Sequence, residues 1–329
     1  SRGAASTARR MRVVPAPSAS AFEPIPLPLL RRAPDAFAEA LGRAFEETGF
    51  AVIRDHGVDP AVIDRALLAA KAFFALPVEA KRAYHAPDGA GQRGYTPFAV
   101  EVAKGAAARD LKEFWHVGRE LPAGDPLRAV MADNVYVREV EGWKKATGAL
   151  YAALEAVGLD LLAAIARRLA LPTDFFEDPV RNGNSVLRLL HYPAQDSPPP
   201  EGSVRAGAHE DINVITLLLG AEEGGLEVLH RSGAWLAINP PPGSLVVNIG
   251  DMLQRLTCGR LPSTTHRVVN PRPERARFAR YSTPFFLHFR PDYLIRPLET
   301  CALPGKTPPA PITAQDFLMQ RLREIGLAS

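Results

Sequence analysis

The sequence predicts an α+β fold in which helices buttress a β core made of two sheets. Apolar residues recur at helical spacing over much of the chain before Asn182. Short β-rich runs separated by turn residues follow after Asn182, and a last helical pattern lies near the C-terminus. Many short strands at close intervals are typical of a sandwich or barrel rather than of alternating βαβ units.

Composition and charge exclude several classes of protein. Of the 329 residues, 47% are apolar and 23% are charged, so material for a sizeable core is present. The 39 Lys and Arg residues nearly balance the 36 Asp and Glu residues, which argues against a nucleic-acid binder that neutralises phosphates. No uninterrupted apolar run is long enough for a membrane span. Cys258 and Cys301 are too few for a disulfide framework or a cysteine-based zinc site.

Three segments are expected along the chain. Residues 1–21 combine arginines with Ser, Ala and Pro and contain no acidic residue, which indicates a disordered tail, a targeting segment or an expression remnant. Residues 22–135 are expected to form an N-terminal helical region. Residues 136–329 are expected to hold a long central helix, a β core at about 183–290 and a C-terminal helix. We expect one integrated structural domain, because single β-rich domains often reach this length.

The N-terminal half is expected to be mainly helical. The apolar pattern that begins at Asp35 stops at Gly49, a residue that favours the left-handed conformation of a helix end. Glycines and prolines in residues 86–134 predict an irregular segment. The expected elements are a helix over 35–49, a buried strand over 50–53, helices over 60–75 and 78–84, and a helical tract over 136–171 that is broken or bent near Gly158.

The C-terminal half is expected to be rich in strands. Turn-forming pairs such as Gly224-Gly225 separate its short apolar runs. The expected strands cover residues 185–192, 204–209, 214–219, 226–229, 235–238, 245–249, 266–269 and 278–287. A final helix is expected over 313–326, with Thr313 as its N-cap.

His209-Glu210-Asp211 is the most informative polar cluster. On a strand, residues two apart point to one face, so His209 and Asp211 would converge while Glu210 faces away. His266 opens another expected strand of the same β region. Two imidazoles and one carboxylate form the facial triad of non-haem Fe(II) oxygenases, which leaves open positions for substrate, co-substrate and O2. The alternative is a surface loop followed by an unrelated histidine.

A second polar cluster indicates an anion site. Arg280 and Ser282 would share one face of an otherwise apolar strand, where a buried guanidinium needs a partner. The planar fork of Arg280 suits a carboxylate, and Ser282 can donate one more hydrogen bond. Arg188 and Tyr192 share one face of the strand over 185–192 and can reach the same anion. The alternative is an ion pair between strands.

Together these residues resemble the isopenicillin N synthase-like branch of the 2-oxoglutarate/Fe(II)-dependent dioxygenase superfamily. The resemblance is carried by His209-x-Asp211, His266 and Arg280-x-Ser282, which are linked by residues 243–253 (GSLVVNIGDML). The N-terminal half is also similar to that branch at residues 47–57 (ETGFAVIRDHG) and 72–77 (AFFALP). The similarity covers roughly residues 22–325, and the motifs are specific when taken together.

The resemblance implies a distorted double-stranded β-helix, or jelly roll, with the metal in its mouth. It makes His209, Asp211 and His266 the iron ligands. It also implies that Arg280 and Ser282 hold the distal carboxylate of 2-oxoglutarate, with Tyr192 as a further partner and Arg188 near the same anion. Leu190 departs from the family pattern, since many relatives have Asn there. A proline-rich insertion over 271–277 lengthens the loop before Arg280.

Aromatic residues near the expected mouth are candidates for substrate contact. Tyr95 and Phe114 lie in the irregular N-terminal segment, which often supplies such contacts in jelly rolls, and Phe286 follows the Arg-x-Ser pair. The alternative for the segment around Phe114 is an edge strand with a charged face. His191 is expected to face away from the site as a structural residue, and Asp251 is expected to be a helix N-cap.

The function implied is an oxidoreductase, a dioxygenase that uses Fe(II), 2-oxoglutarate and O2 to oxidise, and by default hydroxylate, a small molecule with release of succinate and CO2. The chemistry would be centred on the iron, so no separate acid or base is assigned. One alternative is an oxidase of the same scaffold that uses no 2-oxoglutarate. A non-catalytic binding protein with a structural metal is another, although closed metal sites normally use four ligands. The need for reduced iron predicts a cytoplasmic location. Neither nucleic acid nor membrane is an expected partner.

Overall fold

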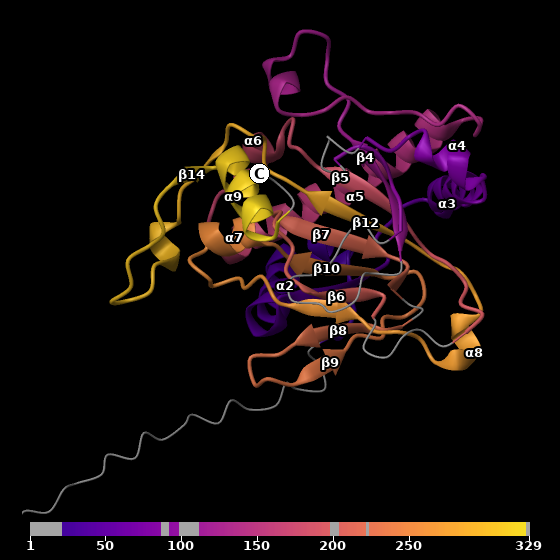
Figure 1. Cartoon of the computed structure of the whole chain (residues 1–329). Coiled ribbons are helices and arrows are strands. Elements are labelled where there is room, and N and C mark those ends of the chain that lie inside the picture. Colours follow the sequence, from indigo (N-terminus) through magenta and orange to yellow (C-terminus); the bar gives the residue numbers. More distant parts are fainter. Residues whose placement is uncertain (1–21, 87–91, 99–111, 198–203, 222–223, 327–329) are drawn as a thin grey trace, which may run out of the picture.

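The fold is built around two mainly antiparallel sheets (Figure 1). The computed structural model describes residues 22–86, 92–98, 112–197, 204–221 and 224–326. Apolar side chains from both sheets meet in one buried cluster, so the sheets face each other around a shared interior. The predicted α+β jelly roll is therefore confirmed. The expected disordered or targeting segment at residues 1–21 lies outside the described residues.

The larger sheet has the strand order β1-β2-β10-β7-β12-β5-β4-β3, and the smaller sheet has the order β6-β11-β8-β9. The strands of the larger sheet are β1 (Ile25–Pro26), β2 (Phe50–Arg54), β3 (Gly94–Thr96), β4 (Glu113–Gly118), β5 (Val186–Tyr192), β7 (Ile215–Leu219), β10 (Leu245–Ile249) and β12 (Arg280–Leu287). Those of the smaller sheet are β6 (Ala206–His209), β8 (Leu226–Leu229), β9 (Trp235–Ala237) and β11 (His266–Val268). A separate pair joins β13 (Leu294–Ile295) to β14 (Ile312–Thr313). Every strand expected after Asn182 is present.

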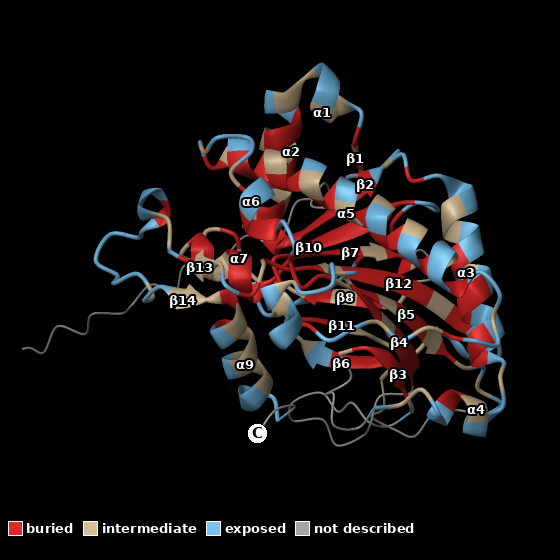
Figure 2. Cartoon of the chain, turned by 90° about the horizontal axis from the view of Figure 1, so that it is seen from above, coloured by how far each residue is buried: buried red, intermediate tan, exposed pale blue. Residues whose placement is uncertain are grey.

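Helices cover the outer face of the larger sheet. In Figure 2 the strands are mostly buried, whereas the outward sides of α2, α3 and α5 are exposed. The helices are α1 (Leu29–Arg32), α2 (Pro34–Thr48), α3 (Pro60–Phe74), α4 (Val78–Arg82), α5 (Trp143–Arg168), α6 (Glu177–Val180), α7 (Asp251–Leu256), α8 (Pro273–Ala276) and α9 (Ala314–Glu324), with short 3-10 turns at Pro126–Ala129 and Glu299–Cys301. Gly49 ends α2 at φ 76°, and Thr313 caps α9, both as predicted.

Side chains of each strand alternate between two environments. In β10, Leu245 and Val247 pack into the main core beneath the helices. Val246 points the other way, into the apolar cluster between the sheets. Asn248 shares the side of Val246, because residues two apart on a strand lie on one face. This alternation sets which residues can reach the interior of the jelly roll.

The central helix differs from its prediction. α5 begins at Trp143 rather than near residue 136, and it runs without a break through Gly158. A Cβ at Gly158 would lie 2.6 Å from Cδ1 of Leu287, so glycine here allows close packing of α5 on β12. α5 is long and apolar enough to cross a membrane by length and composition alone, but 56% of its most apolar window is buried inside the protein.

The prediction of an irregular segment over 86–134 is wrong at residues 94–96 and 113–118, whereas residues 119–134 contain no strand or α-helix. β3 and β4 lie in this segment and extend the larger sheet beyond β5. Local glycines and prolines disfavour strands, but pairing with β5 supplies backbone hydrogen-bond partners that the local sequence does not reveal. Glu113 at the start of β4 is also held by a buried ion pair with Lys81, at 2.9 Å between Nζ and Oε2.

Candidate functional site

Three candidate metal ligands lie together at one end of the β6–β11 pair of the smaller sheet. His209 ends β6 and His266 begins β11, and the two residues are direct partners across the antiparallel pair. Asp211 lies two residues beyond the end of β6, so it does not share a strand face with His209 as predicted. The chain turns at this point, and the turn brings the carboxylate beneath the imidazoles. The three predicted residues are therefore together, although Asp211 arrives by a loop.

The hydrogen bonds of both imidazoles leave one nitrogen of each facing the carboxylate. Nδ1 of His209 bonds to the carbonyl of Gly207 at 2.7 Å, and Nδ1 of His266 bonds to the carbonyl of Thr264 at 3.0 Å. Because a carbonyl can only accept, each Nδ1 carries the proton in the neutral ring and Nε2 keeps a free lone pair. The two Nε2 atoms lie 3.6 Å and 3.7 Å from Oδ1 of Asp211.

The carboxylate of Asp211 is oriented from two strands of the opposite sheet. The hydroxyl of Thr216 on β7 and the side-chain amide of Asn248 on β10 both donate to Oδ2, at 2.6 Å and 2.8 Å. Burial alone would raise the pKa of Asp211, but the facing imidazoles and these two donors outweigh it and lower the pKa. Asp211 is therefore ionised at neutral pH, with Oδ1 turned toward both histidines.

This donor set fits a divalent iron. Within the described residues it is the one group of three or more His, Cys, Asp and Glu side chains that could hold a metal ion, with ligand atoms within 4.8 Å of one another. Two imidazoles and one carboxylate are the donors of non-haem Fe(II) sites, and the absence of a fourth protein ligand leaves positions open. The second oxygen of the carboxylate and both Nδ1 atoms are already bonded, as expected for ligands fixed by their surroundings.

The predicted anion residues lie along the same interior. Arg280 and Tyr192 are register partners on β12 and β5, and Ser282 is partnered by Leu190. Arg280 and Ser282 are buried, and the guanidinium of Arg280 donates to the carbonyls of Gly224 and Gly220 at 3.0 Å and 3.2 Å. Its Cζ lies 5.7 Å from the ring centre of Tyr192. The structure thus brings together Arg280, Ser282 and Tyr192.

The sequence analysis did not single out one cationic residue beside Tyr192. The guanidinium of Arg205 lies over the aromatic ring of Tyr192, with its Cζ 5.2 Å from the ring centre. Arg188, in contrast, is four residues along β5 from Tyr192, which is about 13 Å on an extended strand. The guanidinium of Arg188 nevertheless lies on Phe114, which packs with Tyr192, so the nearness of Arg188 to the anion of Arg280 stays a prediction. No motif distinguished Arg205, which lay inside the strand predicted over 204–209 and directly precedes β6 in the structure.

Arg188 forms a wall with aromatic residues. Its Nε donates to Nε2 of His116 at 2.8 Å, and its Cζ lies 4.0 Å from the ring centre of Phe114 and 5.2 Å from that of Phe286. Phe286 is the register partner of Thr216, the residue that orients Asp211. We call Phe114, His116, Arg188 and Phe286 the planar wall. It places two of the predicted substrate residues, Phe114 and Phe286, in one cluster near the triad.

Comparisons with known proteins agree with this geometry. Two family models match, described as non-haem dioxygenase in morphine synthesis N-terminal, over residues 24–139, and 2OG-Fe(II) oxygenase superfamily, over residues 183–289. The 2-oxoglutarate-Fe(II) type oxidoreductase hxnY of Emericella nidulans is 34% identical over 283 residues, which cover 83% of this chain and 80% of that protein. A solved 2OG-Fe(II) oxygenase family protein from Caulobacter crescentus is 56% identical, with a TM-score of 0.87 over 92% of this chain and 99% of that chain. Neurospora crassa T7H, solved with alpha-KG and thymine, is 28% identical, with a TM-score of 0.80 over 92% and 96% of the two chains.

The chain belongs to the 2OG-Fe(II) oxygenase superfamily. This oxygenase is an oxidoreductase that uses Fe(II), 2-oxoglutarate and O2 to oxidise a small molecule. The resemblance inferred from the motifs is confirmed. The two alternatives, an oxidase without 2-oxoglutarate and a non-catalytic binding protein, do not fit this assignment.

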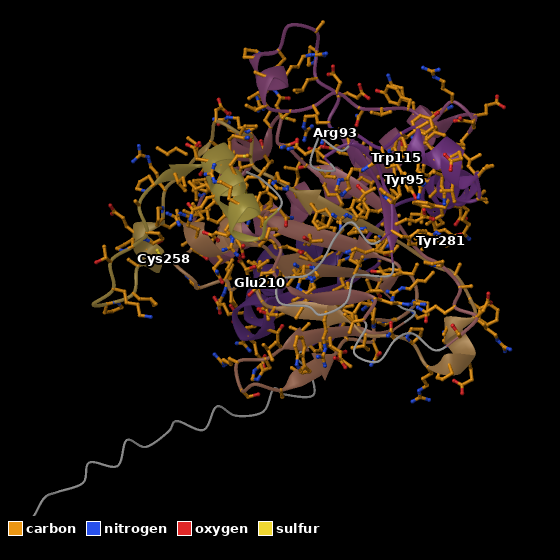
Figure 3. The ribbon with its side chains drawn as sticks, viewed as in Figure 1. Arg93, Tyr95, Trp115, Glu210, Cys258 and Tyr281 are labelled. Carbon is orange, nitrogen blue, oxygen red and sulfur yellow. The ribbon has the colours of Figure 1, made fainter. Side chains whose placement is uncertain are left out.

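Tyr95 lies in the main core, on the other side of the sheet from Phe114, and this position does not fit its predicted contact with substrate. Tyr95 is the register partner of Trp115, and both side chains enter the main core on the helix side of the sheet. In Figure 3 the two residues lie near α3 and α4. The hydroxyl of Tyr95 donates to Oε2 of Glu113 at 2.5 Å. Alternation along β3 and β4 explains the outcome, because Phe114 faces the interior only if Tyr95 and Trp115 face outward.

Two further residues of the oxygenase can now be placed. His191 faces away from the triad, where it bonds to Glu113 at 2.7 Å and stacks on Tyr281. Asp251 is the first residue of α7, and Gly250 rather than Asp251 occupies the N-cap position. The backbone amide of Asp251 donates to the carbonyl of Asp211 at 2.7 Å, which helps to hold the loop that carries Asp211. A cavity of about 440 Å³ behind Asp251 contains no triad residue.

Proposed function

We propose that this oxygenase hydroxylates a small planar molecule that stacks on the planar wall. In this proposal His209, Asp211 and His266 hold Fe(II), while Arg280 and Ser282 hold the distal carboxylate of 2-oxoglutarate, with Tyr192 beside them. The bound iron supplies the redox chemistry that couples O2 to decarboxylation of 2-oxoglutarate and to oxidation of a substrate C–H bond. The overall change converts 2-oxoglutarate, O2 and substrate into succinate, CO2 and hydroxylated product.

The observation that carries the proposal is the arrangement of Arg188 over Phe114 and Phe286. A guanidinium and aromatic rings present flat, polarisable surfaces, which favour flat ligands and offer donors at their edge. The thymine in the structure of Neurospora crassa T7H is a ligand of this shape, which supports the same class of substrate here.

The interior supports neighbouring sites for the two organic molecules. Arg280 and Phe286 lie six residues apart on β12, which is about 20 Å along the strand. Thr216 lies opposite Phe286 on the neighbouring strand, and its hydroxyl donates to Asp211. Phe114, another member of the planar wall, packs beside Tyr192. The planar wall therefore extends from the carboxylate-binding residues toward Thr216 and the triad. The residues of the chain bind and orient the two organic molecules, and the apolar interior limits access of water to the reacting C–H bond.

Two further expectations, the cellular location and the type of substrate, belong to the same proposal. We propose a cytoplasmic location, since Fe(II) must be kept reduced for this chemistry. We also propose that the substrate is a free small molecule rather than nucleic acid, in keeping with the near-balance of 39 basic and 36 acidic residues.

The test is substrate-stimulated formation of succinate by the iron-loaded enzyme. Planar heterocycles and aromatic compounds are compared with aliphatic amino acids of similar size. We expect stimulation by planar compounds, and we expect Phe286→Ala and Arg188→Leu to raise the KM for them while leaving the KM for 2-oxoglutarate nearly unchanged. Arg267→Leu is a matched control, because Arg267 stacks on Trp235 of the smaller sheet at 3.9 Å and lies outside the planar wall. Stimulation by aliphatic compounds alone would contradict the proposal.

A further inference from the structure

A buried cation near the planar wall lacks a carboxylate partner. Arg93 is 6% exposed and forms no ion pair with any residue that the structure describes. One Nη donates to the carbonyl of Gln92 at 2.7 Å, and the other makes a long contact of 3.5 Å with Oδ1 of Asn184. Nε is buried without a hydrogen-bond partner. Burying a charge in this way is costly unless something pairs with it.

The guanidinium of Arg93 lies on the interior face of β4. A Cβ at Gly118 would come within 2.0 Å of the Cζ of Arg93, so the guanidinium packs directly on the backbone of Gly118. Gly118 shares a face of β4 with Phe114 and His116, because residues two apart on a strand point to the same side. Arg93 therefore lies beside the planar wall.

A second polar group on the same face of the sheet also lacks a partner. Thr96 is 3% exposed, and its hydroxyl forms no hydrogen bond within the described parts of the chain. Thr96 is the register partner of Phe114, and directly opposed residues in a sheet share a face. Buried polar groups in native proteins almost always form hydrogen bonds. The unpaired Nε of Arg93 and hydroxyl of Thr96 on one face therefore indicate a place where a ligand binds.

Among the residues that the structure describes, none forms an ion pair with Arg93. Tyr151 and Asp133 attract Arg93, but burial raises the pKa of Tyr151 and keeps it neutral, and Asp133 is paired with Arg128 at 2.7 Å. Burial, together with the positive charge of Arg93, lowers the pKa of His288 to about 4, so His288 is neutral and adds no second charge. The interior near the planar wall is thus left with a positive charge that a ligand can neutralise.

We infer that the substrate carries a carboxylate or a similar anionic group that binds Arg93, with Thr96 donating to the same molecule. This inference rests on the proposed function and narrows it to planar anions. A carboxylate matches the fork of a guanidinium with two parallel hydrogen bonds and satisfies the orphan Nε. Arg93 is then the specificity-determining counterpart of Arg280, each binding the anionic end of a different molecule.

The experiment compares carboxylates with their uncharged amides. Benzoate and benzamide are titrated into the Fe(II) enzyme with 2-oxoglutarate under nitrogen, and binding is followed by calorimetry. We expect the wild type to bind benzoate about 10-fold to 100-fold more tightly than benzamide, in line with the strength of a hydrogen bond to a charged group. Arg93→Met should abolish this preference and leave binding of 2-oxoglutarate unchanged. Equal affinities in the wild type, or no binding of benzoate, would overturn the inference.

Stability measurements distinguish this role from a structural one. Since Arg93 has no ion pair to lose, Arg93→Met should keep or raise the Tm. Arg119→Met is the matched control, because Arg119 is 15% exposed, pairs with Glu155 and donates to the carbonyl of Gly183 at 2.7 Å. That control should lower the Tm by several degrees. A comparable fall for Arg93→Met would assign Arg93 to the framework and overturn the inference.

A second pair of probes distinguishes the inference from the proposed function. Cyclohexanecarboxylate and its amide carry the same groups on a ring that is not flat. If Arg93 discriminates this pair as strongly as the benzoate pair, and the two carboxylates bind equally, the anion site stands and the planar-substrate proposal fails. Binding of flat amides and flat carboxylates with equal strength would instead retain the planar wall and remove the anion site.

Discussion

Thr216 donates its hydroxyl hydrogen to Oδ2 of Asp211 at 2.6 Å, although the two residues belong to different parts of the jelly roll. Asp211 follows β6 of the smaller sheet, whereas Thr216 lies on β7 of the larger one. Asn248 on the neighbouring β10 donates to the same oxygen. The larger sheet thus orients the carboxylate, while the smaller sheet supplies both imidazoles. The relation between the sheets consequently determines the geometry of the triad.

We predict that Thr216→Val weakens Fe(II) binding. Valine keeps the volume of threonine but removes the donor, so the carboxylate is free to rotate away from the histidines. Groups that orient metal ligands typically contribute 10-fold to 100-fold in metal affinity, and we expect a loss of about that size. Anaerobic competition with a chelator measures the affinity directly.

Thr147→Val is the control for this prediction. Thr147 is also buried, but its hydroxyl donates to the carbonyl of Trp143 within α5, far from the triad in the fold. This variant should change stability slightly and iron affinity not at all. Thr216→Ser should retain most of the affinity, since the hydroxyl remains. Unchanged iron binding by Thr216→Val would show that Asn248 alone orients Asp211.

We also predict that Arg280→Ala raises the KM for 2-oxoglutarate sharply and leaves iron binding nearly intact. The guanidinium is buried beside Ser282, and loss of a charge-assisted hydrogen bond costs about 1.5–3 kcal/mol, or roughly 10-fold to 100-fold in KM. Ser282→Ala should have a smaller effect, because it removes a neutral donor. Titration of 2-oxoglutarate into the anaerobic Fe(II) protein, followed by its charge-transfer absorption, checks binding apart from turnover. A normal titration curve for Arg280→Ala would place the carboxylate elsewhere.

Much of the fold and the triad could be predicted from the sequence. Periodicity and turn residues are local signals, and they located α2, α3, α9 and the strands from β5 to β12, but not the short pair β13 and β14. The donors His209, Asp211 and His266 were recognised because their residue types and spacing reflect metal chemistry rather than tertiary packing. The sequence analysis placed Asp211 on the same strand as His209. Local patterns did not show where β6 ends, because that depends on the turn that follows it.

The rest depended on pairing between distant segments. β3 and β4 form because β5 offers a free edge, and neither Gly94 nor Glu113 signals this locally. The same pairing decides that Tyr95 faces the helices and Phe114 the interior. Nothing in the sequence indicated that Thr216 and Asn248 hydrogen-bond to Asp211, although Asn248 lies in the segment 243–253 that joins the motifs.

Glu113 provides a prediction about pH. Its side chain is 1% exposed and accepts from Lys81, Tyr95 and His191. Burial alone would raise the pKa of Glu113, but these hydrogen bonds and the charge of Lys81 outweigh it and hold the pKa below its ordinary value. A lowered pKa in the folded state contributes stability above the unfolded pKa, and that contribution is lost as the pH falls through the folded pKa. We expect Glu113→Gln to cost about 3–5 kcal/mol at neutral pH, because Lys81 is left buried and unpaired, and to cost progressively less below about pH 4.5.

Denaturant unfolding at several pH values checks the Glu113 prediction. The double variant Lys81→Met with Glu113→Gln should be less destabilised than the sum of the two single variants, since neither charge is then left alone. A difference between Glu113→Gln and the wild type that stays constant down to pH 3 would show that the charge of Glu113 does not matter.

The last prediction concerns a fragment that begins at Asn182. This fragment lacks β2 and β4, which pair with β10 and β5 of the larger sheet, and it lacks α5, whose Leu154 and Leu161 are fully buried in the main core. The fragment would expose two sheet edges and the apolar face beneath the helices, so we expect an insoluble or molten product that binds a hydrophobic dye and unfolds without cooperativity. Calorimetry and dye binding measure both properties. A fragment that unfolds cooperatively and binds Fe(II) would instead show that the β core is a separate domain, because the triad residues His209, Asp211 and His266 all lie within it.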